Sequence, residues 1–375
     1  MALNHEMNVH VMDLVERFAA VNVLVVGDAI LDGYLRGSAT RLCREAPAPV
    51  VDVDHRFYVP GGAANAAHNV RSLGGQVQFL STIGDDLEGD LLRHALEASG
   101  TATNLLVQSS DRQTLSKQRL VADGQVLVRF DLGSTTPLTG DTEVQFLTRL
   151  ESAFAHADVV LISDYAYGTM TDRVLRRLGE LQSSSPRVLV VDARELSRYR
   201  ALAPTAVKPN YAEAVAVLSN GRTPTWAAPP PRERVRWLEP AGDRLLELTG
   251  AKICAVTLDV DGALAFERDR PPYRAYARPA RATQSTGAGD SFAAALALAL
   301  ASGADTATAI EVASAAADRV VERDGTVACS SQDLRRALSR APNGPSTRCR
   351  TARTSLPPSP VWTTWFRSTS RLRSS

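Results

Sequence analysis

The chain has 375 residues, of which 44% are hydrophobic and 22% are charged, and its formal net charge is +1. This composition is that of a globular protein large enough to bury a sizeable core. The near-neutral charge gives no reason to expect binding to nucleic acid or to a membrane. The four cysteines are far apart and form no CxxC pair, which disfavours a disulfide framework or a zinc site. Because the N-terminus has no apolar signal-peptide core, we expect a cytoplasmic protein.

The first predicted elements are a helix and a buried strand. Residues 1–20 are assigned to an N-terminal helix, because apolar residues recur at helical spacing over 9–20. Residues 21–27 (VNVLVVG) predict a buried parallel strand. Asp28 and Asp32 follow it, at the end of the strand where open α/β sheets bind their ligands. No G-x-G-x-x-G motif follows, which disfavours a dinucleotide-binding fold.

The next segment predicts a small separate sheet and a glycine-rich turn. Residues 50–54 and 57–59 are short strand patterns bordered by proline, as in edge strands. Gly61 and Gly62 then precede an alanine-rich helix. They let the backbone approach a ligand closely, and Asn65 offers both a donor and an acceptor there. The alternative is a glycine-rich helix start without a ligand.

Residues 76–83 predict one strand, and residues 87–98 predict a helix. Two further strand patterns, 115–121 and 125–131, flank Asp123-Gly124, a strong hairpin signal. Strand alternation places Lys117 and Arg119 on one face of the first strand, and Arg129 shares a face of the second with Asp131. These charges are either a solvated face or a binding site for a substrate that carries a phosphate.

From residue 141 onward, helical and strand patterns alternate, which predicts βαβ units and a parallel sheet. The predicted segments are 142–155, 159–163, 171–182, 188–192, 253–258, 305–322 and 332–339. Asn210 and Glu213 have the spacing of a helix capping box. Residues 221–240 are rich in proline and arginine and predict a surface insertion.

The loop 284–292 leads into a run of alanine and leucine, Ala293–Ala301, which predicts a helix. Gly287 and Gly289 allow a tight turn, and the first amides of the helix form an anion hole. Asp290 lies inside it. It is either a helix cap or a base for an attacking hydroxyl.

Residues 341–375 differ from the rest of the chain. They contain six arginines, no acidic residue, thirteen serines or threonines and five prolines, and no periodicity fits them. The composition predicts a disordered tail.

Three motifs occur in a characteristic order: Gly61-Gly62-x-x-Asn65, Asn210-x-x-Glu213 and Gly287-Ala288-Gly289-Asp290. Together they resemble the PfkB (ribokinase-like) carbohydrate kinase family. The resemblance implies a kinase domain over 21–340, with a doubly wound, mostly parallel α/β sheet, helices on both faces and a small β lid. The lid strands are expected at about 34–60 and 115–131, and a homodimer through the lid is expected.

The resemblance also implies a role for each motif residue, with ATP and Mg²⁺ as the other participants. Asp290 is expected to be the catalytic base, and Gly287, Ala288 and Gly289 the anion hole. Asp32, Gly61, Gly62 and Asn65 are expected to hold the sugar. Asn210 and Glu213 are expected to position Mg²⁺ through water, and Thr257 and Gly262 to form the nucleotide-binding turn. These roles suit phosphoryl transfer, which depends on positioning and charge neutralisation.

A narrower resemblance concerns the acceptor. The stretches VLVVGDAILD (23–32), EAPAPV (45–50), VRFD (128–131) and SDY (163–165) resemble the kinase domain of bifunctional heptose-phosphate kinase/adenylyltransferases. It implies phosphorylation of the anomeric hydroxyl of D-glycero-D-manno-heptose 7-phosphate to the 1,7-bisphosphate. Lys117, Arg119 and Arg129 would hold the distal phosphate.

Other readings remain open: another sugar or nucleoside kinase of the family, or a non-catalytic protein that binds a sugar or nucleotide. Gln284 stands where family members often have Asp, at a position associated with monovalent-cation activation, so no dependence on potassium is assigned. The bifunctional relatives carry a nucleotidyltransferase domain with a His-containing motif, which 341–375 lack. We therefore expect the product to be the bisphosphate.

Overall fold

The computed structural model describes residues 11–220, 230, 233–277, 287–322 and 327–339. Of the predicted N-terminal helix (1–20), residues 1–10 lie outside the described residues, 11–17 are helical and 18–20 form the 3-10 helix η1 (Phe18–Ala20). The predicted tail (341–375), Gln284 and most of the predicted insertion lie outside the described residues. Within the described residues, no helix is both long and apolar enough to cross a bilayer.

The largest element is an eight-stranded sheet with the order β14-β13-β12-β11-β10-β9-β1-β4. Neighbouring strands from β4 to β12 are parallel, and β13 and β14 are added antiparallel at one edge. This confirms the predicted doubly wound, mostly parallel α/β fold. The strands are β1 (Asn22–Gly27), β4 (Gln76–Leu80), β9 (Val159–Asp164), β10 (Val188–Ala193), β11 (Ala206–Val207), β12 (Ile253–Thr257), β13 (Ala263–Glu267) and β14 (Tyr273–Ala275).

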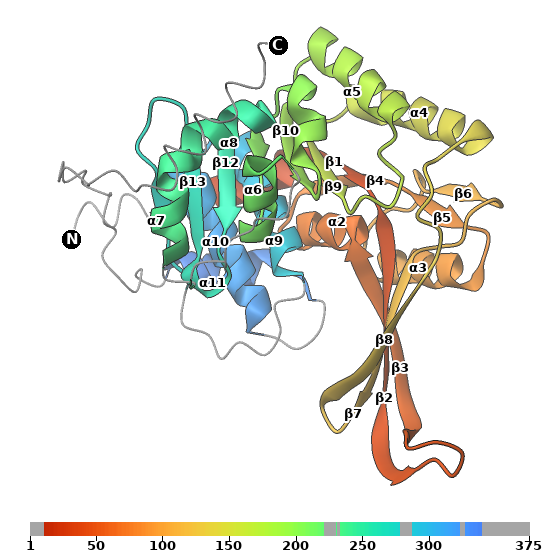
Figure 1. Ribbon diagram of the computed structural model, residues 1–375. Coiled ribbons are helices and arrows are strands. Elements are labelled where there is room, and N and C mark those ends of the chain that lie inside the picture. Colours follow the sequence, from red (N-terminus) through yellow and green to blue (C-terminus); the bar gives the residue numbers. More distant parts are fainter. Residues whose placement is uncertain (1–10, 221–229, 231–232, 278–286, 323–326, 340–375) are drawn as a thin grey trace, which may run out of the picture. The chain divides into compact units, whose positions relative to one another are not determined.

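Helices cover both faces of this sheet because successive strand residues point to opposite sides (Figure 1). Val23 and Val25 of β1 are buried in one core, with α2, α3, α9, α10 and α11. Leu24 and Val26 are buried in the other, with α4, α5, α6, α7 and α8. The helices are α2 (Ala63–Ser72), α3 (Leu87–Ala98), α4 (Gly140–Ala155), α5 (Asp172–Ser184), α6 (Tyr211–Leu218), α7 (Arg234–Leu238), α8 (Gly242–Thr249), α9 (Ala288–Ala301), α10 (Thr306–Val321) and α11 (Ser331–Ser339).

A second sheet of four strands has the order β3-β2-β7-β8 and forms a twisted ribbon in Figure 1. We call this sheet the lid. Its strands are β2 (Ala29–Leu42), β3 (Pro49–Gly62), β7 (Ser116–Ala122) and β8 (Gln125–Leu132). β2 begins one residue after Asp28, and β3 runs directly into α2. The lid therefore starts at the edge of the main sheet where β1 ends.

The prediction of one strand over 76–83 is wrong. Residues 76–80 form β4 in the main sheet, whereas Thr82–Gly84 form β5, which pairs with β6 (Val107–Ser109) in a separate two-stranded sheet. The chain changes sheets at Ser81, whose hydroxyl donates to Gly27 O (2.6 Å) and accepts from Ala29 N (3.0 Å). These long-range bonds leave no signal in the local strand pattern of residues 76–83.

The predicted insertion 221–240 is also corrected at its described end. Residues Arg234–Leu238 form α7, in which Val235 and Leu238 are buried, and Trp237 packs against Tyr211 with ring centroids 6.0 Å apart. This end of the segment therefore belongs to the core on one face of the main sheet.

Candidate active site

The candidate site lies where several parallel strands end and α9 begins. β1, β9, β10 and β11 run in the same direction, so their carboxyl ends meet at one edge of the sheet. Asp28, Asp164, Asp192 and Lys208 come from these four ends. α9 packs against β9 and β10 and brings Asp290 to the same edge.

Asp290 is buried, with 6% of its surface exposed, and both of its carboxylate oxygens accept hydrogen bonds. Asn65 Nδ2 donates to Oδ2 at 2.7 Å and the Tyr165 hydroxyl donates to Oδ1 at 2.9 Å. Burial raises the pKa of Asp290, and these two donors and Lys208 offset part of that rise. A carboxylate has further lone pairs, so this one is oriented and can still accept a proton.

The start of α9 has the features of an anion-binding site. Gly287 is the N-cap, with φ of +88°, a conformation that favours glycine. The following amides have no partner inside the helix and carry the positive end of its dipole. A side chain on Gly289 would begin 3.3 Å from Lys208 Nζ, so a cation lies beside these amides.

Lys208 is itself held in place by a carboxylate. Its ammonium lies 3.1 Å from Asp192, and both side chains are largely buried. Burial lowers the pKa of Lys208, but the carboxylates of Asp192 and Glu213 outweigh it and raise this pKa overall. Lys208 therefore stays positively charged beside Gly289.

The Asn210–Glu213 pair forms a complete capping box at the start of α6. Asn210 Oδ1 accepts from Glu213 N (2.9 Å), and Glu213 Oε2 accepts from Asn210 N (2.8 Å). Within the described residues, the second carboxylate oxygen of Glu213 has no hydrogen-bond partner. The pair can thus cap the helix and still face the water shell of a cation, a mode of binding that suits strongly hydrated Mg²⁺.

Thr257 and Gly262 lie next to this pair. Thr257 forms a parallel bridge with Asn210, and its amide donates to Pro209 O at 2.9 Å. Gly262 has φ of +86°, and a Cβ there would lie 2.2 Å from Ala275 O, so only glycine fits this turn.

The residues expected to hold the sugar meet where β2 begins and β3 ends, a region that we call the root of the lid. Arg119 donates to Asp32 at 2.8 Å. A Cβ on Gly61 would lie 2.4 Å from the Asp32 carboxylate, so glycine at 61 makes room for this carboxylate. Gly62 caps α2 with φ of +56°, and α2 carries Asn65.

The three predicted phosphate-binding cations lie on one face of the lid, but their surroundings differ. Asp32 is opposite Lys117, and Arg119 is opposite Arg129. Arg129 forms a bidentate pair with Asp131 at 2.9 Å, with about half of both side chains exposed. Lys117 has no ion pair among the described residues, and its ammonium lies 5.3 Å from the ring centroids of both Tyr165 and Tyr167.

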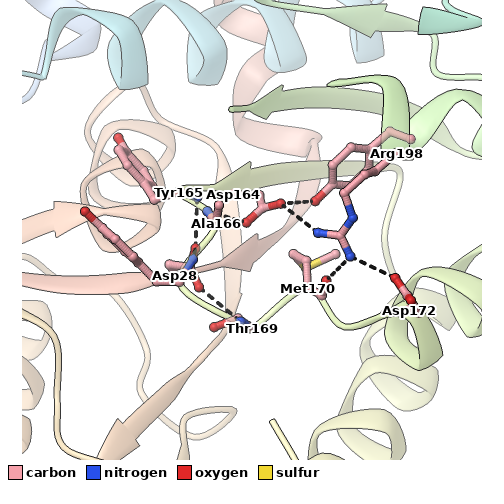
Figure 2. Close-up of polar contacts among 10 residues, drawn as sticks. Asp28, Asp164, Tyr165, Ala166, Thr169, Met170, Asp172 and Arg198 are labelled. Atoms are coloured by element: carbon pink, nitrogen blue, oxygen red, sulfur yellow. Dashed lines mark hydrogen bonds and ion pairs between the residues drawn. The ribbon is translucent and has the colours of Figure 1, made fainter. Parts of the chain in front are cut away.

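Residues to which the sequence reasoning assigned no role complete the site. The Tyr165 hydroxyl donates to Asp290, and the charge of Lys208 acts on Asp290. Two buried carboxylates lie next to Tyr165 in Figure 2: Asp28, which accepts from the Tyr165 amide, and Asp164, which precedes Tyr165 in the chain. Asp28 and Asp164 lie at strand ends and within the stretches 23–32 and 163–165 that carry the narrower resemblance, but neither signal gave them a role. The contacts of Asp28 join segments more than a hundred residues apart.

Comparison with known proteins places this geometry among sugar kinases. A family model described as pfkB family carbohydrate kinase matches residues 21–333. The chain is 32% identical over 336 residues to the bifunctional protein HldE of Desulfatibacillum aliphaticivorans, which covers 89% of this chain. It is also 32% identical over 326 residues to the bifunctional protein HldE of Gluconobacter oxydans, which covers 87%. The chain spans 66% of the length of each of these relatives, just under two thirds.

Two solved structures have the same fold. Phosphofructokinase-2 from Escherichia coli, in complex with substrates and products, matches with a TM-score of 0.67 at 20% identity, over 85% of this chain and 98% of that one. Arabidopsis thaliana ribokinase, complexed with ribose and ATP, matches with a TM-score of 0.63 at 20% identity, over 86% of this chain and 99% of that one.

Proposed function

Because this chain belongs to the pfkB family of carbohydrate kinases, we propose that it transfers the γ-phosphoryl group of ATP to the anomeric hydroxyl of D-glycero-D-manno-heptose 7-phosphate. The product is the 1,7-bisphosphate. The observation that carries the proposal is the buried Asp290 carboxylate, held by Asn65 and Tyr165 at the N-terminus of α9. The similarity to HldE proteins over most of the chain supports the heptose phosphate as acceptor.

In this mechanism Asp290 takes the proton from the attacking hydroxyl. Its raised pKa makes it a stronger base than an exposed aspartate. The amides of Ala288 and Gly289, with Lys208 beside them, stabilise the negative charge that develops on the transferred phosphoryl group. Asp32, Asn65 and the backbone at Gly61 and Gly62 hold the sugar hydroxyls.

The nucleotide side consists of Thr257, Gly262 and the Asn210–Glu213 pair. The carboxylate oxygen of Glu213 outside the capping box suits a hydrated Mg²⁺, which when bound would neutralise charge on the ATP phosphates. Asn210 and Glu213 would hold this ion through its waters, while their capping box keeps α6 in place.

The lid supplies the distal phosphate site. Lys117 is the leading candidate, because Arg119 and Arg129 are already paired with Asp32 and Asp131. The Lys117 ammonium would neutralise the distal phosphate of the substrate. The enzyme would then bind a sugar phosphate more tightly than the free sugar.

The opposite face of the lid supports a homodimer. β8 is an edge strand whose residues are all exposed, and Val128, Phe130 and Leu132 are between 40% and 48% exposed. Strand alternation puts these three on the face away from Arg129 and Asp131. An unpaired apolar edge of this kind is typical of a surface that a partner covers, and the partner proposed here is a second copy of the chain.

The proposal is tested by measuring ATP consumption with Mg²⁺ and heptose 7-phosphate, fructose 6-phosphate, ribose, adenosine or no sugar. Turnover confined to heptose 7-phosphate is the expected result. Turnover on an unphosphorylated sugar or on adenosine would keep the kinase and reject the phosphate site. ATP binding without turnover on any acceptor would favour a non-catalytic binding protein.

A further inference from the structure

The segment 165–169, between β9 and α5, connects the lid to the proposed base. The Tyr165 hydroxyl donates to Asp290 at 2.9 Å. The rings of Tyr165 and Tyr167 are stacked, with centroids 6.4 Å apart, and the Lys117 ammonium lies 5.3 Å from each. The shape of this segment therefore decides where the Tyr165 hydroxyl and both rings lie.

This shape is not one that the local sequence favours. Ala166 has φ of +61°, in the left-handed region that residues with a side chain rarely adopt. Gly168 has φ of +94°, and a Cβ there would lie 2.2 Å from Thr136 O. A segment with such a backbone needs contacts from elsewhere in the chain to keep it in one conformation.

Asp28 supplies those contacts through its carboxylate. Oδ2 accepts from the amides of Tyr165 (2.8 Å) and Tyr167 (3.1 Å), and Oδ1 accepts from the amide of Thr169 (3.2 Å). The side chain is fully buried. Figure 2 shows Asp28 joined by dashed lines to Tyr165 and Thr169.

Two other side chains hold the same segment. Asp164 Oδ1 accepts from Ala166 N at 2.8 Å. Arg112, from the stretch before β7, donates to Tyr167 O at 3.1 Å and also to Ser134 O and Thr136 O. The buried carboxylates of Asp28 and Asp164 thus accept from the backbone amides of segment 165–169. The Arg112 guanidinium donates to a backbone carbonyl of the same segment, that of Tyr167.

We propose that Asp28, opposed by Arg112, is a positioning residue for phosphoryl transfer: it fixes segment 165–169 so that the Tyr165 hydroxyl orients the Asp290 carboxylate. This inference rests on the proposed function of the Asp290 site. Asp28 acts through Tyr165 and does not itself contact the reacting groups. Its charge is needed because a carboxylate can accept from all three amides, whereas an amide side chain offers one accepting atom and a competing donor.

The first test is the Asp28→Asn variant, which keeps the size of the side chain and removes its charge. We expect kcat with the sugar phosphate to fall roughly 100-fold, because small misplacements of catalytic groups have effects of this size. The KM for ATP should stay unchanged, since the nucleotide residues come from β12 and α6. Asp172→Asn is the matched control: it makes the same chemical change at the exposed start of α5 and should behave as wild type.

The second test is a double-mutant cycle with Tyr165→Phe, which removes the hydroxyl from Asp290. If Asp28 acts through Tyr165, the double variant should be no slower than the slower single variant. Losses that multiply would overturn the proposal, because they would mean that Asp28 affects turnover by an independent route.

Amide hydrogen exchange at residues 165, 167 and 169 provides a readout that does not depend on activity. These amides should be protected in the wild type and exchange faster in Asp28→Asn, with the strands of the main sheet unchanged. Unchanged protection would overturn the proposal. If the wild-type protein turns over no sugar, the proposed function is rejected. The exchange result would still show whether Asp28 holds segment 165–169.

If Asp28→Asn does not fold, Arg112→Gln carries the same prediction from the other side of the segment. It should lower kcat at constant KM for ATP and increase exchange at the same amides. Wild-type kcat and wild-type exchange in this variant would overturn the proposal.

Discussion

The two sheets that build the site differ in how they are stabilised. Every residue of β9 is buried and the central strands have helices on both faces, whereas every residue of β8 in the lid is exposed. The main sheet is therefore held by its own core, whereas the outer strand of the lid has no core on either face among the described residues. We infer a corresponding division of function: the main sheet and its helices position the base and the anion hole, and the lid selects the substrate.

The strongest test of this division removes the base on the core side. Asp290→Asn keeps the N-terminus of α9 and its amides but removes the proton acceptor. We expect kcat to fall by about 10²–10⁴, the range for general base catalysis, while ATP affinity measured by calorimetry is retained. Turnover close to wild type would mean that Asp290 only caps α9 and that the proposed division is wrong.

A smaller effect is expected from the lid cation. Lys117→Ala should raise KM for the phosphorylated sugar by roughly 10- to 100-fold, the loss expected for one hydrogen bond to a charged group, and should leave KM for the dephosphorylated sugar nearly unchanged. Arg129→Ala is the control on the same face, because Arg129 is already paired with Asp131. An equal rise in KM for both sugars would contradict a phosphate site at the lid.

The outer face of the lid should matter for assembly more than for chemistry. Phe130→Asp places a charge on the apolar face of β8, and we expect the dimer dissociation constant to rise by roughly 30-fold or more, as for a residue central to an interface. Analytical ultracentrifugation over a dilution series measures it. Val144→Asp, at an exposed apolar position on α4, is the matched control. A wild-type chain that is monomeric at all concentrations would refute the proposed dimer.

The prediction with the smallest effect concerns stability on the core side. Burial and the neighbouring Asp28 raise the pKa of Asp164 from 3.8 to about 6, although the Tyr199 hydroxyl and Arg198 oppose this. Because the folded state binds this proton more tightly than the unfolded state, Asp164 makes the fold less stable as pH rises from about 4 to 6.

This contribution is isolated by comparing the wild type with Asp164→Asn. The Tm of the wild type relative to the variant should fall by on the order of 5 °C between pH 4 and pH 6.5, and should then stay level. A difference that is constant over this range would show that Asp164 does not titrate there. A relative Tm that increases with pH would show the opposite sign, a depressed pKa.

Sequence reasoning succeeded where the determining interactions are local. The run 21–27 predicted β1 because a short, mostly apolar stretch ending in glycine needs no distant partner to be recognised. Asn210 and Glu213 are three residues apart, so their capping box could be anticipated before its hydrogen bonds were seen. The roles of these residues toward ATP and Mg²⁺ stay predictions.

It failed where a side chain acts across the fold. Ser81 ends β4 by bonding to Gly27 and Ala29, more than fifty residues away in sequence. Asp28 binds the amides of a segment that begins at Tyr165. Neither contact has a spacing that a pattern could reveal, because the partners meet only after the main sheet has formed.

One feature of α9 limits how such an enzyme can change over evolution. Its residues from Asp290 to Ala299 are all buried, and those after Phe292 are alanine or leucine packed against α2, α10, β9 and β10. A larger side chain there would strain the core and shift the base with it. New acceptors are therefore more readily acquired by mutations at exposed positions of the lid, such as those of β8, and an effort to redesign specificity would start there.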